Sequence, residues 1–227
     1  MKKVLFACIS VSLLAISCSK SDDPTPAGGE KYMSTTAGST WNYQFTDNIT
    51  PANSNNYTVT SSSRDTVASS KTFHVFDNSN GNSEYYNITA SDYYTLQAFS
   101  LGTTDTALVN LYLKDGAAVN DNWLQSYTLD AGGVPVQVNV TNKIQEKGIT
   151  KIVGTTTYTN VIHVVSTISS PTIASLPGSS LTTNINYYYA PKYGMIQNDA
   201  KIDLVVPLLT LDQHTDTQTK LLSATIL

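Results

Sequence analysis

Hydrophobic and polar residues alternate along most of the chain, which is the pattern of β-strands with one buried face. The clearest run is 40–45, where Trp41, Tyr43 and Phe45 would share one face and polar residues the other. Nowhere do hydrophobic residues recur at helical spacing over three turns, so we expect little helix. The alternation predicts strands at 40–45, 55–63, 71–77, 83–89, 93–99, 106–113, 123–129, 134–140, 149–153, 158–168, 184–190, 195–211 and 220–227.

Turn-forming residues separate these runs. Asn80-Gly81 supplies residues that tolerate positive φ and predicts a tight hairpin between 71–77 and 83–89. The oxygen-bearing residues around it offer a calcium loop as an alternative, but Phe76 stands where an EF-hand needs Asp, which favours the hairpin. Lys147-Gly148 predicts another turn, and 158–168, apolar on both faces, predicts a central strand covered on both sides.

These elements predict an all-β, predominantly antiparallel fold, either a curved sheet or a sandwich or half-barrel, in one domain covering 32–227. The chain also suggests an internal repeat of two similar halves. Trp41 and Trp123 each open a strand, and Phe73 and Tyr158 lie in similar surroundings. The segment 90–94 resembles 190–194 in the same order. If the repeat is real, the two tryptophans occupy equivalent strands.

Composition narrows the choice of partner. Charged residues are 13% of the chain, and the basic ones are scattered singly, so no nucleic acid is expected as a partner. Ser, Thr and Asn fill most polar positions instead. The 14 tyrosines fit half-buried strand positions, with the ring packed and the hydroxyl wet. Aromatic faces of this kind could alternatively stack on sugars.

The first residues form an export signal. Lys2 and Lys3 precede a short apolar run that ends at residue 16, too short to span a membrane. The six residues ending at Cys18 resemble a bacterial lipobox, which implies cleavage between Ser17 and Cys18 and a lipid on the Cys18 sulfur. We therefore assign 1–17 to a lipoprotein signal peptide and 18–31, which is polar and rich in Pro and Gly, to a flexible tether.

Several segments resemble β-rich surface lipoproteins of the Bacteroidetes whose domain has no known function. They are 32–43, 119–123, with Asn120 where a glycine is commoner, 187–196 and 220–223. The charged run after Cys18 resembles the surface-export signal of that phylum. The resemblance implies an outer-membrane protein that is lipid-anchored and faces the cell surface. It also marks Thr66 and Thr106 as possible O-glycosylation sites, within Asp65-Thr66-Val67 and Asp105-Thr106-Ala107.

No motif for catalysis, metal binding or nucleotide binding is present, so we expect no catalytic residue, no metal and no cofactor. His74 and His163 lie within strand patterns and are expected to be structural, and His214 is expected in a polar turn. Sets of His, Asp and Ser can be drawn from any chain this rich in Ser, so their presence in the sequence indicates nothing.

Three functions remain open. The first is a non-catalytic binding or scaffold module anchored at the outer membrane, with glycans as a candidate ligand. The second is an envelope carrier of lipid or lipoprotein, with an apolar pocket lined by residues such as Val161, Val165, Ile185 and Leu204. The third is a hydrolase, which would need two carboxylates in one cleft.

Overall fold

In the computed structural model, residues 30–100, 105–130, 133 and 135–227 are described. The predicted signal peptide, Cys18 and most of the predicted tether lie outside these residues. Each predicted run overlaps a strand, and β4 has the predicted bounds. The runs 134–140 and 149–153 belong to one strand, and the run 195–211 is interrupted by a 3-10 helix at 207–209. The strands are β1 (Thr40–Asp47), β2 (Asn55–Ala68), β3 (Lys71–Asn78), β4 (Ser83–Thr89), β5 (Asp92–Ser100), β6 (Asp105–Lys114), β7 (Asn122–Asp130), β8 (Pro135–Val153), β9 (Thr156–Ser169), β10 (Ser180–Ala190), β11 (Gly194–Val206) and β12 (Leu211–Thr225).

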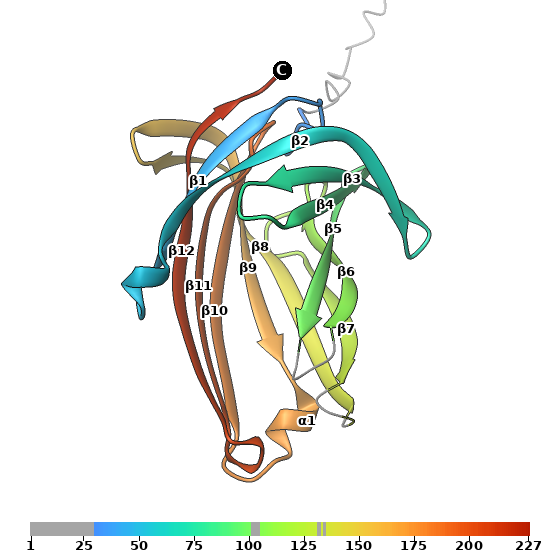
Figure 1. Ribbon diagram of the computed structural model, residues 1–227, viewed down its shortest axis with the longest axis vertical. Helices are drawn as coiled ribbons and strands as arrows, with labels where there is room; N and C mark the ends of the chain where they lie inside the picture. Colours follow the sequence, from blue (N-terminus) through green and yellow to red (C-terminus); the bar gives the residue numbers. More distant parts are fainter. Residues whose placement is uncertain (1–29, 101–104, 131–132, 134) are drawn as a thin grey trace, which may run out of the picture.

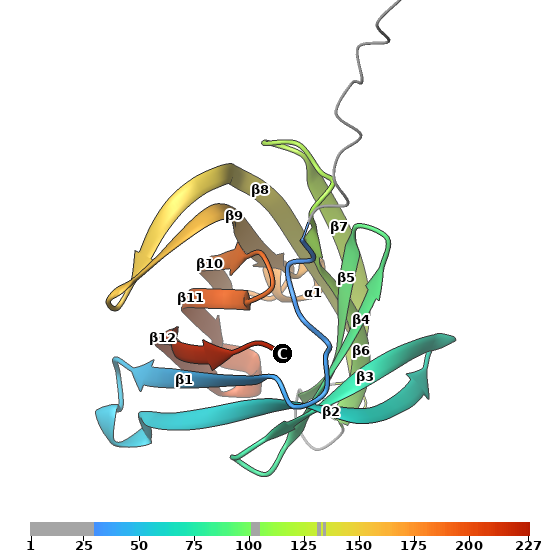
Figure 2. The same cartoon turned by 90° about the horizontal axis from the view of Figure 1, so that it is seen from above.

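All twelve strands belong to one antiparallel sheet, in the order β6-β5-β4-β3-β2-β1-β12-β11-β10-β9-β8-β7. Every strand pairs with its neighbour in sequence except β6 with β7, and β1 pairs with β12. The sheet curls until its two edges, β6 and β7, face each other (Figures 1 and 2). The prediction of an antiparallel, curved all-β fold is confirmed, and the sheet is nearly closed rather than split into two packed layers.

Side chains bridge the remaining edge between β6 and β7. The Gln125 side chain accepts a hydrogen bond from the Leu111 N–H (2.7 Å) and donates one to the Leu111 carbonyl (3.1 Å). Trp123 Nε1 donates to the same carbonyl (2.7 Å), and the Tyr127 hydroxyl donates to the Val109 carbonyl (3.1 Å). These bonds satisfy backbone groups that a neighbouring strand would otherwise pair. We call this contact the seam.

Short segments cover both ends of the sheet. Residues 30–39 cross the upper end (Figure 2), held there by Lys192 N–H to Lys31 O (2.6 Å) and Tyr32 N–H to the Tyr93 hydroxyl (3.0 Å). The helix α1 (Pro171–Ala174) lies at the lower end in Figure 1 and buries Ile173 in the second of two hydrophobic clusters. The short 3-10 helices η1 (Pro51–Asn53) and η2 (Pro207–Leu209) complete the helical content of the described residues.

Two turn predictions are wrong. At Lys147-Gly148 the chain does not reverse: β8 continues through it, with Gly148 at φ +75° and the pairing to β9 shifting register nearby. A glycine at positive φ suits a β-bulge as well as a turn. Residues 212–216, expected as a polar turn around His214, are part of β12 and pair with β11. The Asn80-Gly81 hairpin is confirmed, with Gly81 at φ +92°.

The topology satisfies the condition set by the repeat hypothesis. Trp41 is the second residue of β1 and Trp123 the second of β7, so the two lie six strands apart around the sheet. Phe73 and Tyr158 are the third residues of β3 and β9, again six strands apart. The segments 90–94 and 190–194 form the β4–β5 and β10–β11 turns. A shift of six strands in the chain order thus relates all three pairs, as a duplication would require.

Asn120 lies at a turn whose backbone conformation favours glycine. Asn120 has φ +73°, in the left-handed region that glycine adopts freely and Asn tolerates better than most residues. Its N–H donates to the Ile144 carbonyl (2.8 Å), which fixes the entry into β7. Asn therefore substitutes for glycine at this turn.

Candidate active and binding sites

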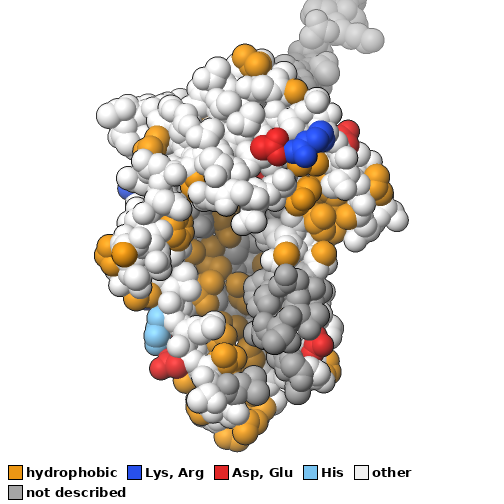
Figure 3. All heavy atoms as spheres, viewed as in Figure 1, with side chains coloured by type: hydrophobic (Ala, Val, Ile, Leu, Met, Phe, Trp, Pro, Cys, Tyr) orange, Lys and Arg blue, Asp and Glu red, His pale blue; other side chains and the backbone are white. Residues whose placement is uncertain are grey.

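A cavity of about 250 Å³ lies within the sheet, between the two covered ends. That volume approaches the small end of ligand-binding pockets, about 300–1,000 Å³. Figure 3 shows a hollow on this face with hydrophobic side chains at its floor. The hollow lies below β1 to β4, which cross the upper end of the sheet (Figure 1). There β1 pairs only with residues 217–225 of β12, and β4 pairs only with residues 92–95 of β5. The lower halves of β5 and β12 therefore have no strand between them.

The cavity wall is mostly apolar and aromatic. Polar side chains are few and come from β4 to β6, β8 and β9. The described lining residues are Met33, Tyr43, Tyr57, Glu84, Tyr86, Thr95, Gln97, Leu108, Asn110, Tyr112, Tyr127, Leu129, Val138, Val140, Asn142, Ser166, Ile168, Ile185, Tyr187, Tyr189 and Met195.

Seven of the fourteen tyrosines face this cavity, and none of the fourteen is exposed. Burial raises the pKa of Tyr43, Tyr86 and Tyr189 well above the usual 10.0. Some hydroxyls have partners in the wall, such as Tyr43 to the Met195 carbonyl (2.9 Å). Others, on Tyr57 and Tyr187, have no hydrogen-bond partner among the described residues. The aromatic faces that could have stacked on sugars at the surface are instead turned inward.

Glu84 is the one charged side chain among the described lining residues. Its two carboxylate oxygens accept hydrogen bonds from the Tyr86 hydroxyl (2.6 Å) and from Asn78 Nδ2 (2.7 Å). Its charge adds to burial in raising the pKa of Tyr57 and Tyr86. The site thus combines an aromatic, largely apolar wall with a single negative charge.

The sequence predicted an apolar pocket, but most of the residues predicted to line it do not do so. Of the four residues named for it, Ile185 lines the cavity. Val165 lies on the opposite face of β9 from the lining residues Ser166 and Ile168, because side chains alternate along a strand. Val161 is buried in the upper hydrophobic cluster, and Leu204 packs against the lower one. No alternation signal separates a cavity wall from a packed core, since both are apolar.

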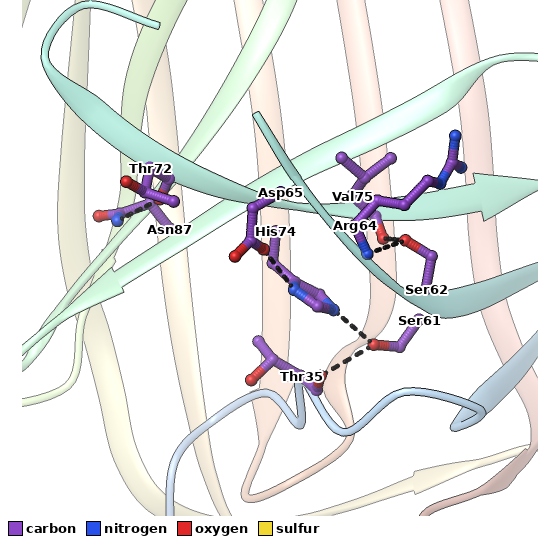
Figure 4. Close-up of polar contacts among 9 residues, drawn as sticks. All are labelled: Thr35, Ser61, Ser62, Arg64, Asp65, Thr72, His74, Val75 and Asn87. Carbon is purple, nitrogen blue, oxygen red and sulfur yellow. Dashed lines mark hydrogen bonds and ion pairs between the residues drawn. The ribbon is translucent and has the colours of Figure 1, made fainter. Parts of the chain in front are cut away.

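A second site, which sequence reasoning set aside, lies at the upper end of the sheet (Figure 4). His74 Nδ1 is 2.8 Å from an Asp65 carboxylate oxygen, and His74 Nε2 is 3.0 Å from Ser61 Oγ. A register shift in β2 between Ser61 and Asp65 brings both residues to the same His. The connectivity is that of a Ser-His-Asp triad.

Two features show that this cluster is structural. Ser61 is 1% exposed, so no substrate reaches its hydroxyl. That hydroxyl donates to the Thr35 carbonyl (3.0 Å), so its proton is not directed at His74, as nucleophile activation requires. The cluster instead fastens the segment 30–39 to β2 and β3. A shallow pocket beside it shares Met33 and Tyr86 with the cavity, so these two side chains separate the two spaces.

The other histidines also pair with carboxylates of neighbouring strands. His163 Nδ1 is 2.8 Å from Glu146, and its ring stacks on Tyr188, with centroids 4.3 Å apart. His214 Nδ1 is 2.7 Å from Asp203, and this hydrogen bond raises the pKa of His214. The structural role expected for His74 and His163 agrees with these contacts. Among the described residues, no group of three or more His, Cys, Asp or Glu could hold a metal ion.

The modification sites stay predictions. Ser17 and Cys18 lie outside the described residues. Thr66 lies on β2, opposite Phe73, and is partly buried. Thr106 belongs to β6, but its side chain lies outside the described part. In the part of the chain that the structure describes, no helix is long and apolar enough to cross a membrane.

Comparison with known proteins gives one distant structural similarity. No protein-family model and no curated protein matches the sequence. The fold is similar to a crystal structure described as a "putative lipoprotein" from Parabacteroides distasonis, with a TM-score of 0.45 and 10% identity over 87% of this chain and 99% of that one. The similarity is too distant to carry a functional assignment.

Proposed function

We propose that this protein is a membrane-anchored lipoprotein whose β-sheet binds a small, largely apolar ligand in its internal cavity. The observation that supports this most is the cavity itself: an apolar and aromatic wall of about 250 Å³ with a few polar groups, which is the composition of small-molecule sites. The seven tyrosines give this wall a large apolar area together with hydroxyls that can orient a ligand.

Neither alternative function gains support from the described residues. Glycan binding would need exposed aromatic rings on which sugars could stack, and no tyrosine is exposed. Glycoside hydrolysis needs two carboxylates, and the described cavity wall supplies only Glu84. Ser61, the one hydroxyl that contacts a His among the described side-chain hydrogen bonds, is buried.

Filling the cavity tests the proposal. Val140 lines the cavity from β8, whereas the adjacent Thr141 lies on the other face of the same strand. We expect Val140→Phe to weaken binding of the neutral fluorophore N-phenylnaphthylamine about tenfold or more, because the ring occupies the ligand's space. Thr141→Phe is the matched control and should bind as the wild type does. Equal binding by wild type and Val140→Phe would place the fluorophore elsewhere and reject the proposal.

The anchor is a separate part of the proposal. A diacylglyceryl group on Cys18, with an acylated amine, would hold the protein stably at a membrane, since two or more chains are needed for that. The proposal that the protein faces the cell surface at the outer membrane is based on the charged run after Cys18. We expect Cys18→Ser to release the protein from the membrane fraction, and protease added to intact cells to degrade the wild type. Survival of the protein until the cells are broken would place it inside the envelope instead.

A further inference from the structure

In the part of the chain that the structure describes, Glu84 has no cationic partner. No Lys, Arg or His lines the cavity among the described residues, and none of these forms an ion pair with Glu84. Its two partners, Tyr86 and Asn78, are neutral. A partly buried carboxylate normally gains a cation or several donors, because removal of its charge from water is costly. Each carboxylate oxygen can still accept another hydrogen bond.

Tyrosine rings line the same cavity as this charge. Tyr43 and Tyr57 stack, with centroids 5.4 Å apart, and Tyr86 meets Tyr112 edge-on at 6.0 Å. All four line the cavity together with Glu84, and the charge of Glu84 contributes to raising the pKa of each. Tyrosine faces attract cations through their ring quadrupole. The rings and the carboxylate therefore favour the same kind of group.

We propose that the cavity selects amphiphiles whose polar end is an ammonium ion, placed against Glu84 and the tyrosine rings, with the apolar tail along Leu129, Val138 and Ile168. This inference rests on the proposed function, since it names the ligand class of the same cavity. A fatty acid is the disfavoured counterpart, because its carboxylate would meet the charge of Glu84 at short range in a medium of low dielectric. A neutral alcohol should bind with an affinity between those of the ammonium ion and the fatty acid.

Three ligands with the same tail test this: octylamine, octanol and octanoate, titrated calorimetrically at neutral pH. Wild-type protein should bind octylamine about tenfold or more tightly than octanol, the size expected for one charge-assisted hydrogen bond, and octanoate most weakly. Glu84→Gln should remove the preference for octylamine. The control Glu146→Gln, a carboxylate that pairs with His163 instead, should keep it. Octanol serves as the control for the folding of Glu84→Gln. If the variant binds octanol as tightly as the wild type does, its cavity is intact.

The outcomes separate the two proposals. If octanol and octylamine bind wild type equally, or the preference survives Glu84→Gln, the ammonium inference fails while the cavity function stands, provided Val140→Phe weakens both ligands. If none of the three ligands binds the wild type, the proposed function fails as well.

Discussion

The Gln125 side chain takes the place of a neighbouring strand for Leu111: its amide oxygen accepts from the Leu111 N–H at 2.7 Å and its amide nitrogen donates to the Leu111 carbonyl at 3.1 Å. The same nitrogen also donates to Asn110 Oδ1 (2.8 Å). Together with Trp123 and Tyr127, Gln125 thus bridges β6 and β7 where the two strands do not form a ladder. The cavity wall on either side depends on this contact. It is formed by Asn110 and Tyr112 on β6 and by Tyr127 and Leu129 on β7.

Gln125→Leu should destabilise the protein by about 1–3 kcal/mol, because it leaves the Leu111 N–H without a partner at a partly buried position. Chemical denaturation measures the loss. Gln44→Leu is the control: Gln44 is exposed and makes no side-chain hydrogen bond among the described residues, so its replacement should change stability by about 0.5 kcal/mol or less. Equal effects of the two substitutions would show that Gln125 does not hold the seam.

Met33 separates the cavity from the shallow upper pocket, so its truncation should join the two. We expect Met33→Ala to cost about 2 kcal/mol, the low end for a buried Met, since one side of the residue already faces open space. Stopped-flow fluorescence with N-phenylnaphthylamine should show faster association than in the wild type. Thr36→Ala, an exposed change in the same segment, should alter neither quantity. An unchanged association rate in Met33→Ala would show that ligands enter by another route.

The buried tyrosines predict an alkaline limit to stability. Burial raises the pKa of Tyr43, Tyr86 and Tyr189 in the folded protein above 10.0, their ordinary value when unfolded. Their contribution to stability is therefore complete below pH 10 and is lost as pH rises towards the folded values. In a titration followed by tyrosinate absorbance, a fraction of the tyrosines should ionise only together with unfolding. Ionisation of all fourteen near pH 10 in the folded state would contradict the buried cavity wall.

His214 gives a second pH dependence, on the part of β12 that pairs with β11 and not with β1. Its hydrogen bond to Asp203, followed by the nearby charges of Asp212 and Asp203, raises its pKa above 6.5 in the folded state. A raised pKa stabilises the fold fully below pH 6.5, and that contribution disappears as pH rises through the folded value. His214→Gln should flatten the stability profile in this window, measured as the denaturation midpoint against pH. An unchanged profile would show that the Asp203 pairing contributes nothing.

Alternation predicted most strands because one face of each is buried and the other is wet. It failed at residues 212–219, where β12 is polar on both faces and is held by backbone pairing to β11, so no hydrophobic period marks it. The turn predicted at Gly148 was wrong because a glycine at positive φ suits a β-bulge as well as a turn. The seam could not be predicted, since a single sequence does not show that the Gln125 amide meets the backbone of another strand. The Ser61-His74-Asp65 cluster depends likewise on a register shift that no local pattern encodes.

The most direct test of the cavity uses its two methionines. Met33 and Met195 both line the cavity, and Met1, the third, lies in the predicted signal peptide, so a mature protein labelled with ¹³C at the methionine methyls has two signals, both from the site. Titration with octanol should shift both signals along one saturable curve, and Val140→Phe should weaken that response while Thr141→Phe preserves it. If octanol binds, as calorimetry would show, while neither methionine signal moves, the ligand does not enter the cavity and the account is wrong.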